Sequence, residues 1–133
     1  MMMRMKRLAN LAQRGFTLIE LIVVMTIVSL LLTLAAPRYF RSIERSKETV
    51  LKANLTSTRD ALDKFHSDTG RYPDQLDDLV NKHYLRTLPW DPVLERADAW
   101  ILEAPVDGQA GAIYNIRSSA EGAGSNGVPY AQW

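Results

Sequence analysis

The residue types that carry most enzyme chemistry are scarce in this sequence. Cysteine is absent, which excludes disulfides, thiolate metal sites and cysteine nucleophiles. The two histidines, His66 and His83, stand outside any H-E-x-x-H spacing, so surface or helix-end roles are expected for both. No serine, histidine and aspartate grouping has the pattern of a catalytic triad. We therefore expect a protein that is not an enzyme.

One acidic residue stands where a charge is costly. Glu20 is the only charged residue between Phe16 and Ala36, in the run FTLIELIVVMTIVSLLLTLAA. A carboxylate in an apolar helix costs roughly 2.5–3.5 kcal/mol at the centre of a bilayer and less near an end, so it usually has a partner. Snorkelling of Glu20 to lipid headgroups, about 6 Å from the helix start, is the simpler alternative. Basic residues crowd before this run without any acid: Arg4, Lys6, Arg7 and Arg14.

The apolar run that holds Glu20 is long enough to cross a membrane. Twenty-one helical residues span roughly 30 Å, the thickness of the hydrocarbon layer. A cleavable secretory signal is the alternative, but its apolar region usually ends after about 7–15 residues at a small-x-small site. Here Leu34-Ala35-Ala36 is followed by Pro37, a poor match. Residues 16–36 are therefore predicted to form a transmembrane helix.

Beyond Pro37 the apolar residues recur at helical spacing up to Phe65, which predicts an amphipathic continuation of the same helix to His66. The C-terminal half is expected to cover its apolar stripe from Ile43 to Phe65. The other face is expected to be solvated, and it carries Arg41, Arg45, Lys52, Arg59, Asp60 and Lys64. Gly70 and Pro73 mark the stop.

The remaining residues predict a small α+β head. A short helix opens at Pro73-Asp74 and presents four apolar residues, Leu76, Leu79, Val80 and Leu85. Asp74, Asp77 and Asp78 complement the dipole of that helix without any chemistry. Residues 99–104 and 112–117 favour an antiparallel hairpin. The Gly-rich tail from Ser118 is expected to be an ordered loop pinned by two rings, Tyr130 and Trp133, and its G-x-G-x-x-G at 122–127 is expected to supply turn glycines.

Whole-chain averages describe an ordinary single domain. The chain has 133 residues, 47% hydrophobic and 23% charged, with a net charge of +1, so nucleic-acid binding is not expected. The average conceals an asymmetry, because residues 1–15 carry four basic groups and no acid. The 118 residues that follow Gly15 carry twelve basic and fifteen acidic side chains.

The segment Arg14-Gly15-Phe16-Thr17-Leu18-Ile19-Glu20-Leu21 resembles the signal of the type IV pilin and pseudopilin family. The resemblance implies the pilin fold, with a cleaved leader at 1–15, a long helix at 16–66 and a globular head at 67–133 packed on the helix. It also implies that a prepilin peptidase and methyltransferase cuts between Gly15 and Phe16 and methylates the new N-terminus of Phe16.

The same resemblance implies assembly into a helical filament. Glu20 of one subunit would pair with the Phe16 amine of a neighbour, and Pro37 would mark a place where the helix can unwind. The implied partners are further copies of the chain, other pseudopilins or minor pilins, and an inner-membrane assembly platform. The implied location is the bacterial inner membrane, with the leader cytoplasmic and the head periplasmic, and then a periplasmic pseudopilus. The basic residues on the two sides of the span do not decide this orientation.

The head resembles the major pseudopilin of type II secretion systems. The motif residues are G-R-Y-P at 70–73, Y-L-R at 84–86 and L-P-W-D-P at 88–92. This implies a structural subunit that supports protein export across the outer membrane. A type IV pilin for adhesion, motility or DNA uptake is an alternative. A second alternative is a periplasmic binding domain or enzyme that keeps an uncleaved membrane anchor.

The tail departs from the calcium-binding pattern of many major pseudopilins. Gly127 and Pro129 stand where their acidic pair would be. Calcium takes six to eight oxygen ligands, including carboxylates, so we expect no metal and no other cofactor. The remaining possible oxygen donors are Ser118, Glu121, Ser125 and Asn126.

Overall fold

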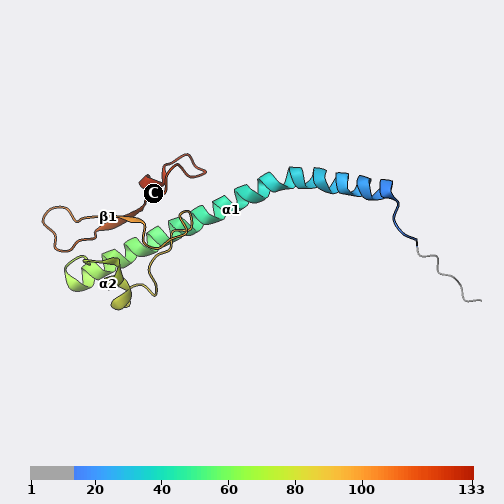
Figure 1. Ribbon diagram of the computed structural model, residues 1–133. Helices are drawn as coiled ribbons and strands as arrows, with labels where there is room; N and C mark the ends of the chain where they lie inside the picture. The colour runs from blue at the N-terminus through green and yellow to red at the C-terminus, as the bar shows by residue number, and fades with distance from the viewer. Residues whose placement is uncertain (1–13) are drawn as a thin grey trace, which may run out of the picture. The chain divides into compact units, whose positions relative to one another are not determined.

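The computed structural model describes residues 14–133 and shows an α+β chain (Figure 1). Its elements are α1 (Leu18–Thr69), α2 (Leu76–Asn81), β1 (Trp100–Glu103), β2 (Asn115–Ser118) and the 3-10 helix η1 (Tyr130–Gln132). This confirms the predicted long N-terminal helix and small antiparallel sheet. The first thirteen residues of the predicted leader lie outside the described residues. The chain divides into two units, one ending at Tyr39 and one formed by Phe40–Trp133.

Helix α1 is a single 52-residue element that passes through Pro37. It ends at Thr69, three residues beyond the predicted end. Gly70 terminates it, because its backbone has a positive φ of 75° and its N–H still bonds to the carbonyl of His66 at 2.8 Å. A side chain at position 70 would be strained in this conformation.

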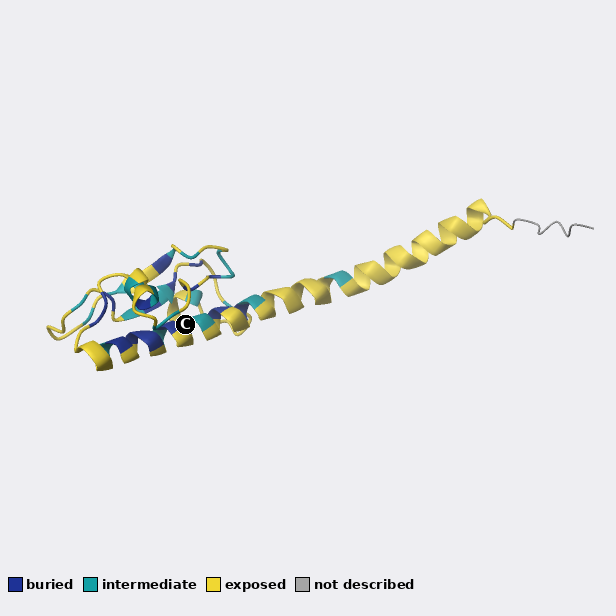
Figure 2. Cartoon of the chain, turned by 90° about the horizontal axis from the view of Figure 1, so that it is seen from below, coloured by how far each residue is buried: buried dark blue, intermediate teal, exposed yellow. Residues whose placement is uncertain are grey.

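The buried stripe of α1 is shorter than predicted. Ile43 is 37% exposed and Val50 is 46% exposed, so the expectation of cover from Ile43 onward was wrong. Figure 2 shows burial confined to one face of the C-terminal part of the helix. The stripe has the spacing of one helix face and begins with an acid: Glu48, Leu51, Leu55, Thr58, Ala61, Leu62 and Phe65.

The head packs its own apolar side chains against this stripe. Leu79 of α2, Trp100 of β1 and Ile116 of β2 join the α1 residues in one buried cluster. The hairpin was predicted correctly, although both strands are shorter than expected. They pair in antiparallel register from Trp100 opposite Ser118 to Glu103 opposite Asn115.

The predicted short helix also ends early. Helix α2 stops at Asn81, and His83 takes a positive φ of 66°. The chain then turns back, so that the N–H of Leu85 bonds to the carbonyl of Leu79 at 2.9 Å. Leu85 packs against the core cluster from this turn and not from a helix. At the start of α2, the Asp78 carboxylate accepts the N–H of Gln75 at 3.1 Å and so caps this helix, in addition to the predicted charge complement to its dipole.

Two residues assigned to the solvated face of α1 also contact the head, although Lys52 stays exposed as expected. Arg59 is half-buried and donates to Asn115 Oδ1 at 2.8 Å and to the carbonyl of Ile116 at 3.0 Å. It also donates to the main-chain oxygen of Trp133 at 2.5 Å. The Lys52 ammonium lies over the Trp133 ring, 4.5 Å from its centroid. The apolar spacing alone did not reveal these roles, because long basic side chains reach around the edge of a stripe.

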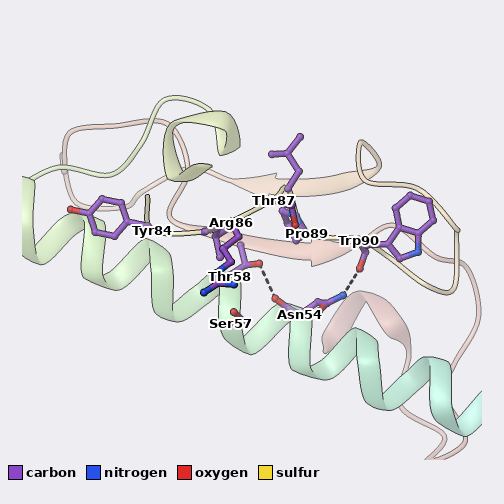
Figure 3. A pocket seen from close by; sticks show the side chains of 10 residues that line it. Asn54, Ser57, Thr58, Tyr84, Arg86, Thr87, Pro89 and Trp90 are labelled. Carbon is purple, nitrogen blue, oxygen red and sulfur yellow. Dashed lines mark hydrogen bonds between the residues drawn. The ribbon is translucent and has the colours of Figure 1, made fainter. Parts of the chain in front are cut away.

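The segment between α2 and β1 is anchored by polar contacts. The Asn54 amide of α1 donates to the carbonyl of Trp90 at 2.6 Å, beside a hollow that Figure 3 shows between α1 and residues 84–90. The Trp100 indole N–H donates to the carbonyl of Pro89 at 2.9 Å. Both contacts fix the L-P-W-D-P segment against the core.

Asp91 is the buried centre of this segment. Its side chain is 1% exposed and accepts the Ser118 hydroxyl at 2.7 Å and the N–H groups of Val93 and Leu94 at 2.9 and 3.2 Å. A buried carboxylate requires such donors, since each unmet hydrogen bond is costly. Asp91 therefore closes the turn at 91–96 and ties it to β2.

We expect Asp91→Ala to lower the free energy of unfolding of the head by about 2–4 kcal/mol, because it leaves the Ser118 hydroxyl and two N–H groups without their acceptor. Denaturant titration of the full chain in detergent, followed by tryptophan fluorescence, measures the change. The control is Asp98→Ala, which removes an exposed carboxylate paired with Arg96 and should leave the free energy of unfolding close to that of the wild type. Equal stability of the two variants would contradict the role of Asp91.

Candidate assembly site

The start of α1 is set by Thr17. Residues 14–17 are not helical, and the Thr17 hydroxyl oxygen accepts the N–H of Glu20 at 3.2 Å. The carbonyl of Thr17 accepts the N–H of Leu21 at 3.1 Å. This is an N-cap, and T-x-x-E is the sequence pattern of a capping box. The pattern could have revealed Thr17 before the structure, although its role is to begin the helix.

Glu20 lies in the first turn of α1 with an exposed side chain. Its carboxylate forms no hydrogen bond or ion pair with any other residue of the range 14–133. A negative charge in the first helical turn is favoured by the helix dipole. The carboxylate is thus stabilised in place and open to a cation from outside the chain.

Gly15 and Phe16 directly precede this capped turn. Phe16 is 83% exposed, and a Cβ at Gly15 would meet nothing within 4 Å. The structure therefore brings three of the predicted site residues, Gly15, Phe16 and Glu20, to one end of α1. Their roles in cleavage, methylation and pairing stay predictions.

Pro37 lies far from this end, about 30 Å along the helix. Proline has no N–H, so the carbonyl of Thr33 loses its usual helical partner. The helix continues through Pro37 with one backbone bond fewer. The unwinding of α1 at Pro37 stays a prediction.

The first part of α1 exposes an unbroken apolar surface. Its large apolar side chains between Phe16 and Leu34 are 44–83% exposed. Within residues 14–133, α1 is the one helix long and apolar enough to cross a membrane. No residue in its most apolar stretch is buried. Such a surface is unstable in water and requires lipid or other apolar chains as cover.

A second polar site ties the C-terminal loop to α1. Glu48 is 9% exposed and accepts the N–H and the hydroxyl of Ser125, both at 2.6 Å, and the Tyr130 hydroxyl at 3.3 Å. The Ser125 hydroxyl, more than any other group, lowers the pKa of Glu48. Burial, and then the Glu48 charge, raises the pKa of Tyr130. Sequence reasoning missed Glu48, although it continues the spacing of the buried stripe.

Three of the residues considered for calcium form hydrogen bonds within the head. Ser118 and Ser125 donate their hydroxyls to Asp91 and Glu48, and the Asn126 side-chain oxygen accepts the N–H of Val128 at 3.0 Å. Among residues 14–133 there is no group of three or more histidine or acidic side chains that could hold a metal ion. The donor set of this loop does not fit calcium, which takes six to eight oxygens.

Two further sequence interpretations are confirmed. The glycines at 122–127 shape a turn, because Gly124 N–H bonds to the carbonyl of Val128 at 3.0 Å and Gly127 N–H to that of Gly124 at 3.0 Å. His66 stacks on Tyr72 in the last turn of α1, with ring centroids 4.3 Å apart, and His83 is exposed.

Comparison with known proteins connects this geometry to a family. Residues 10–36 match the family described as "Prokaryotic N-terminal methylation motif". The type II secretion system core protein G of Xanthomonas campestris is 28% identical over 123 residues, which is 86% of this chain and 85% of that protein. The protein of the same name from Pseudomonas aeruginosa is 34% identical over 60% of this chain and 68% of its own length. The chain belongs to the core protein G family.

The pilin alternative has a narrower match. The type IV major pilin protein PilA of Myxococcus xanthus is 40% identical over 72 residues, which cover 54% of this chain but 32% of that pilin. Similarity to core protein G reaches into the head, as the resemblance of the 70–92 motifs implied. No solved structure matches the chain.

The cap at Thr17 can be tested directly. Thr17→Val keeps the side-chain shape but removes the acceptor, so we expect the Glu20 amide to exchange about fivefold faster, as for the loss of ~1 kcal/mol of capping. Hydrogen exchange of the full chain in detergent micelles, followed by NMR, measures this rate. Thr26→Val is the matched control, since the Thr26 hydroxyl donates to the carbonyl of Ile22 at 2.8 Å. A Glu20 amide that exchanges at the same rate in both variants would contradict the cap.

Proposed function

We propose that this protein is a structural subunit of a type II secretion pseudopilus. The observation that carries the proposal is the uncovered apolar surface of α1 behind a G-F-T-L-I-E start. The apolar helix is joined to a head, and the similarity to core protein G proteins extends over most of the chain. An apolar helix of this kind is stable first in a bilayer and then among the helices of a filament.

Cleavage between Gly15 and Phe16 prepares the subunit for assembly in two ways. It removes the basic leader, whose four positive charges would resist burial in a filament core. It also creates an α-amino group at Phe16, one helical turn before Glu20. The amine of one subunit and the Glu20 carboxylate of its neighbour then neutralise each other, and the pair sets the register of packed helices.

The location and partners follow from this mechanism. The subunit is held in the inner membrane by residues 16–36 with its head in the periplasm, and it then joins a periplasmic pseudopilus. Its partners are copies of itself, other pseudopilins, a prepilin peptidase and methyltransferase, and the inner-membrane assembly platform. The protein acts by polymerising and catalyses no reaction. Its filament supports protein export across the outer membrane.

Glu20→Ala separates processing from assembly. We expect both the wild-type chain and the variant to enter the membrane and to lose residues 1–15, as shown by intact mass with Phe16 methylated. We expect filament yield to fall at least tenfold in the variant, because the Phe16 amine loses its partner on burial. Sheared filaments are quantified by immunoblot.

Glu44→Ala is the control, since Glu44 is also an exposed acid of α1 but lies beyond the apolar run. It should be processed and assembled as the wild type is. Normal filament yield from Glu20→Ala would overturn the pairing with Phe16. A membrane form that retains Met1 to Gly15 would overturn the processing step and favour an uncleaved anchor.

Deletion of the gene separates secretion from pilus function. We expect the exported proteins of the host to accumulate in the periplasm, with surface pili and DNA uptake unchanged, because the proposed filament serves export. Restoring the wild-type chain should restore secretion. Loss of surface pili or DNA uptake with normal secretion would instead establish the type IV pilin alternative.

A further inference from the structure

Glu48 is an acid in a row of apolar positions. It precedes Leu51 and Leu55 on the buried face of α1 and is 9% exposed. A carboxylate in this setting is stable only if donors replace the water it has lost. All three of its hydrogen-bond donors come from the C-terminal loop, two of them from Ser125 and one from Tyr130.

The C-terminal loop, residues 121–133, is held in shape by contacts between its own residues. Ala123 and Pro129 form an antiparallel bridge, and the Trp133 indole N–H donates to the carbonyl of Val128 at 3.1 Å. A Cβ on Gly124 would lie 2.2 Å from the Trp133 ring, so the ring packs directly on the loop backbone. Glu48 binds near the middle of this loop, at Ser125, and so joins the loop to α1.

The carboxylate oxygens of Glu48 and the hydroxyl of Ser125 are already engaged with each other and with neighbouring donors. Both carboxylate oxygens of Glu48 accept hydrogen bonds, and the hydroxyl that binds its Oε2 belongs to Ser125. The one acidic side chain in the loop itself, Glu121, is exposed. The loop thus lacks the acidic pair that the family resemblance associates with calcium, and it holds a hydrogen-bonded carboxylate from α1.

We propose that hydrogen bonds from Ser125 and Tyr130 to Glu48 fasten the C-terminal loop to α1, so that the head of this pseudopilin folds without calcium. The carboxylate and its donors supply internally the negative charge and the cross-link that a bound cation and its acidic ligands would provide. This inference concerns folding of the head and does not depend on the proposed role in secretion.

The surroundings of Glu48 keep it ionised. The hydroxyl of Ser125 lowers the pKa of Glu48 most, and the charge of Lys52 on the same helix lowers it further. Lys47 pairs with Glu95 at 3.6 Å. Glu44, one turn earlier on α1, also lines this region. Because the pKa of Glu48 is lowered from 4.5, the fastening is complete above that pH and is lost as the pH falls through the lowered value.

The test compares hydrogen exchange in peptides covering residues 121–133 of the full chain in detergent. In the wild type, samples with about 5 mM calcium chloride and samples with an excess of EGTA should give the same exchange rates and the same melting temperature. This calcium concentration exceeds the dissociation constants of the weakest usual calcium sites in proteins. Slower exchange or a higher melting temperature in calcium would overturn the proposal. This comparison requires no variant.

Variants then test the fastening itself. Glu48→Ala should raise the exchange rate of the Ser125 amide at least tenfold, as expected for loss of charged hydrogen bonds. Ser125→Ala should have a smaller effect, because it keeps its N–H. Glu44→Ala is the matched control and should exchange as the wild type does. Wild-type protection of the loop in Glu48→Ala would overturn the role of Glu48.

Glu48→Gln covers the case in which the alanine variant does not fold, because glutamine fills the same volume and can still accept the Ser125 N–H. Its melting temperature should lie below that of the wild type at neutral pH. The gap should narrow as the pH falls below 4.5 and close only below the lowered pKa of Glu48, where the folded chain binds the proton. A gap that does not change with pH would contradict an ionised carboxylate at this site.

Discussion

The apolar side chains of residues 16–36 have no cover within the described chain. The other features of the protein depend on how this surface is covered. A helix in this condition is stable in lipid, where its backbone is internally bonded and its side chains meet hydrocarbon. Transfer from lipid into a filament exchanges one apolar surrounding for another. Little apolar free energy changes in that step, so polar groups such as Glu20 are left to decide which arrangement of helices is preferred.

The second part of α1, in contrast to the first, is covered by the head on one face. Its buried stripe is narrow, and the head that covers it contains a two-stranded sheet and a six-residue helix. Such a small head gains limited stability from apolar burial. Polar side chains at well-defined positions add specificity, with Asp91 closing a turn, Arg59 joining three carbonyl or amide oxygens, and Glu48 fastening the last loop.

The sequence allowed prediction of the features that depend on local periodicity. The long helix, the hairpin, the turn glycines and the pinned tail followed from spacing and composition. The residues missed were those whose partners lie far along the chain. Arg59 and Ser125 bond to residues more than fifty positions away, and no local pattern marks such pairs. Glu48 was missed for a related reason, because an acid within a stripe shows its role only when its donors are seen.

The cap at Thr17 determines where the backbone changes from extended chain to helix. Peptide bonds inside a helix are held by their hydrogen bonds and do not fit the extended channel of a typical peptidase. The bond between Gly15 and Phe16 lies on the non-helical side of that boundary, by two residues. The Thr17 cap therefore leaves the predicted cleavage bond in the non-helical segment that precedes the first turn of α1.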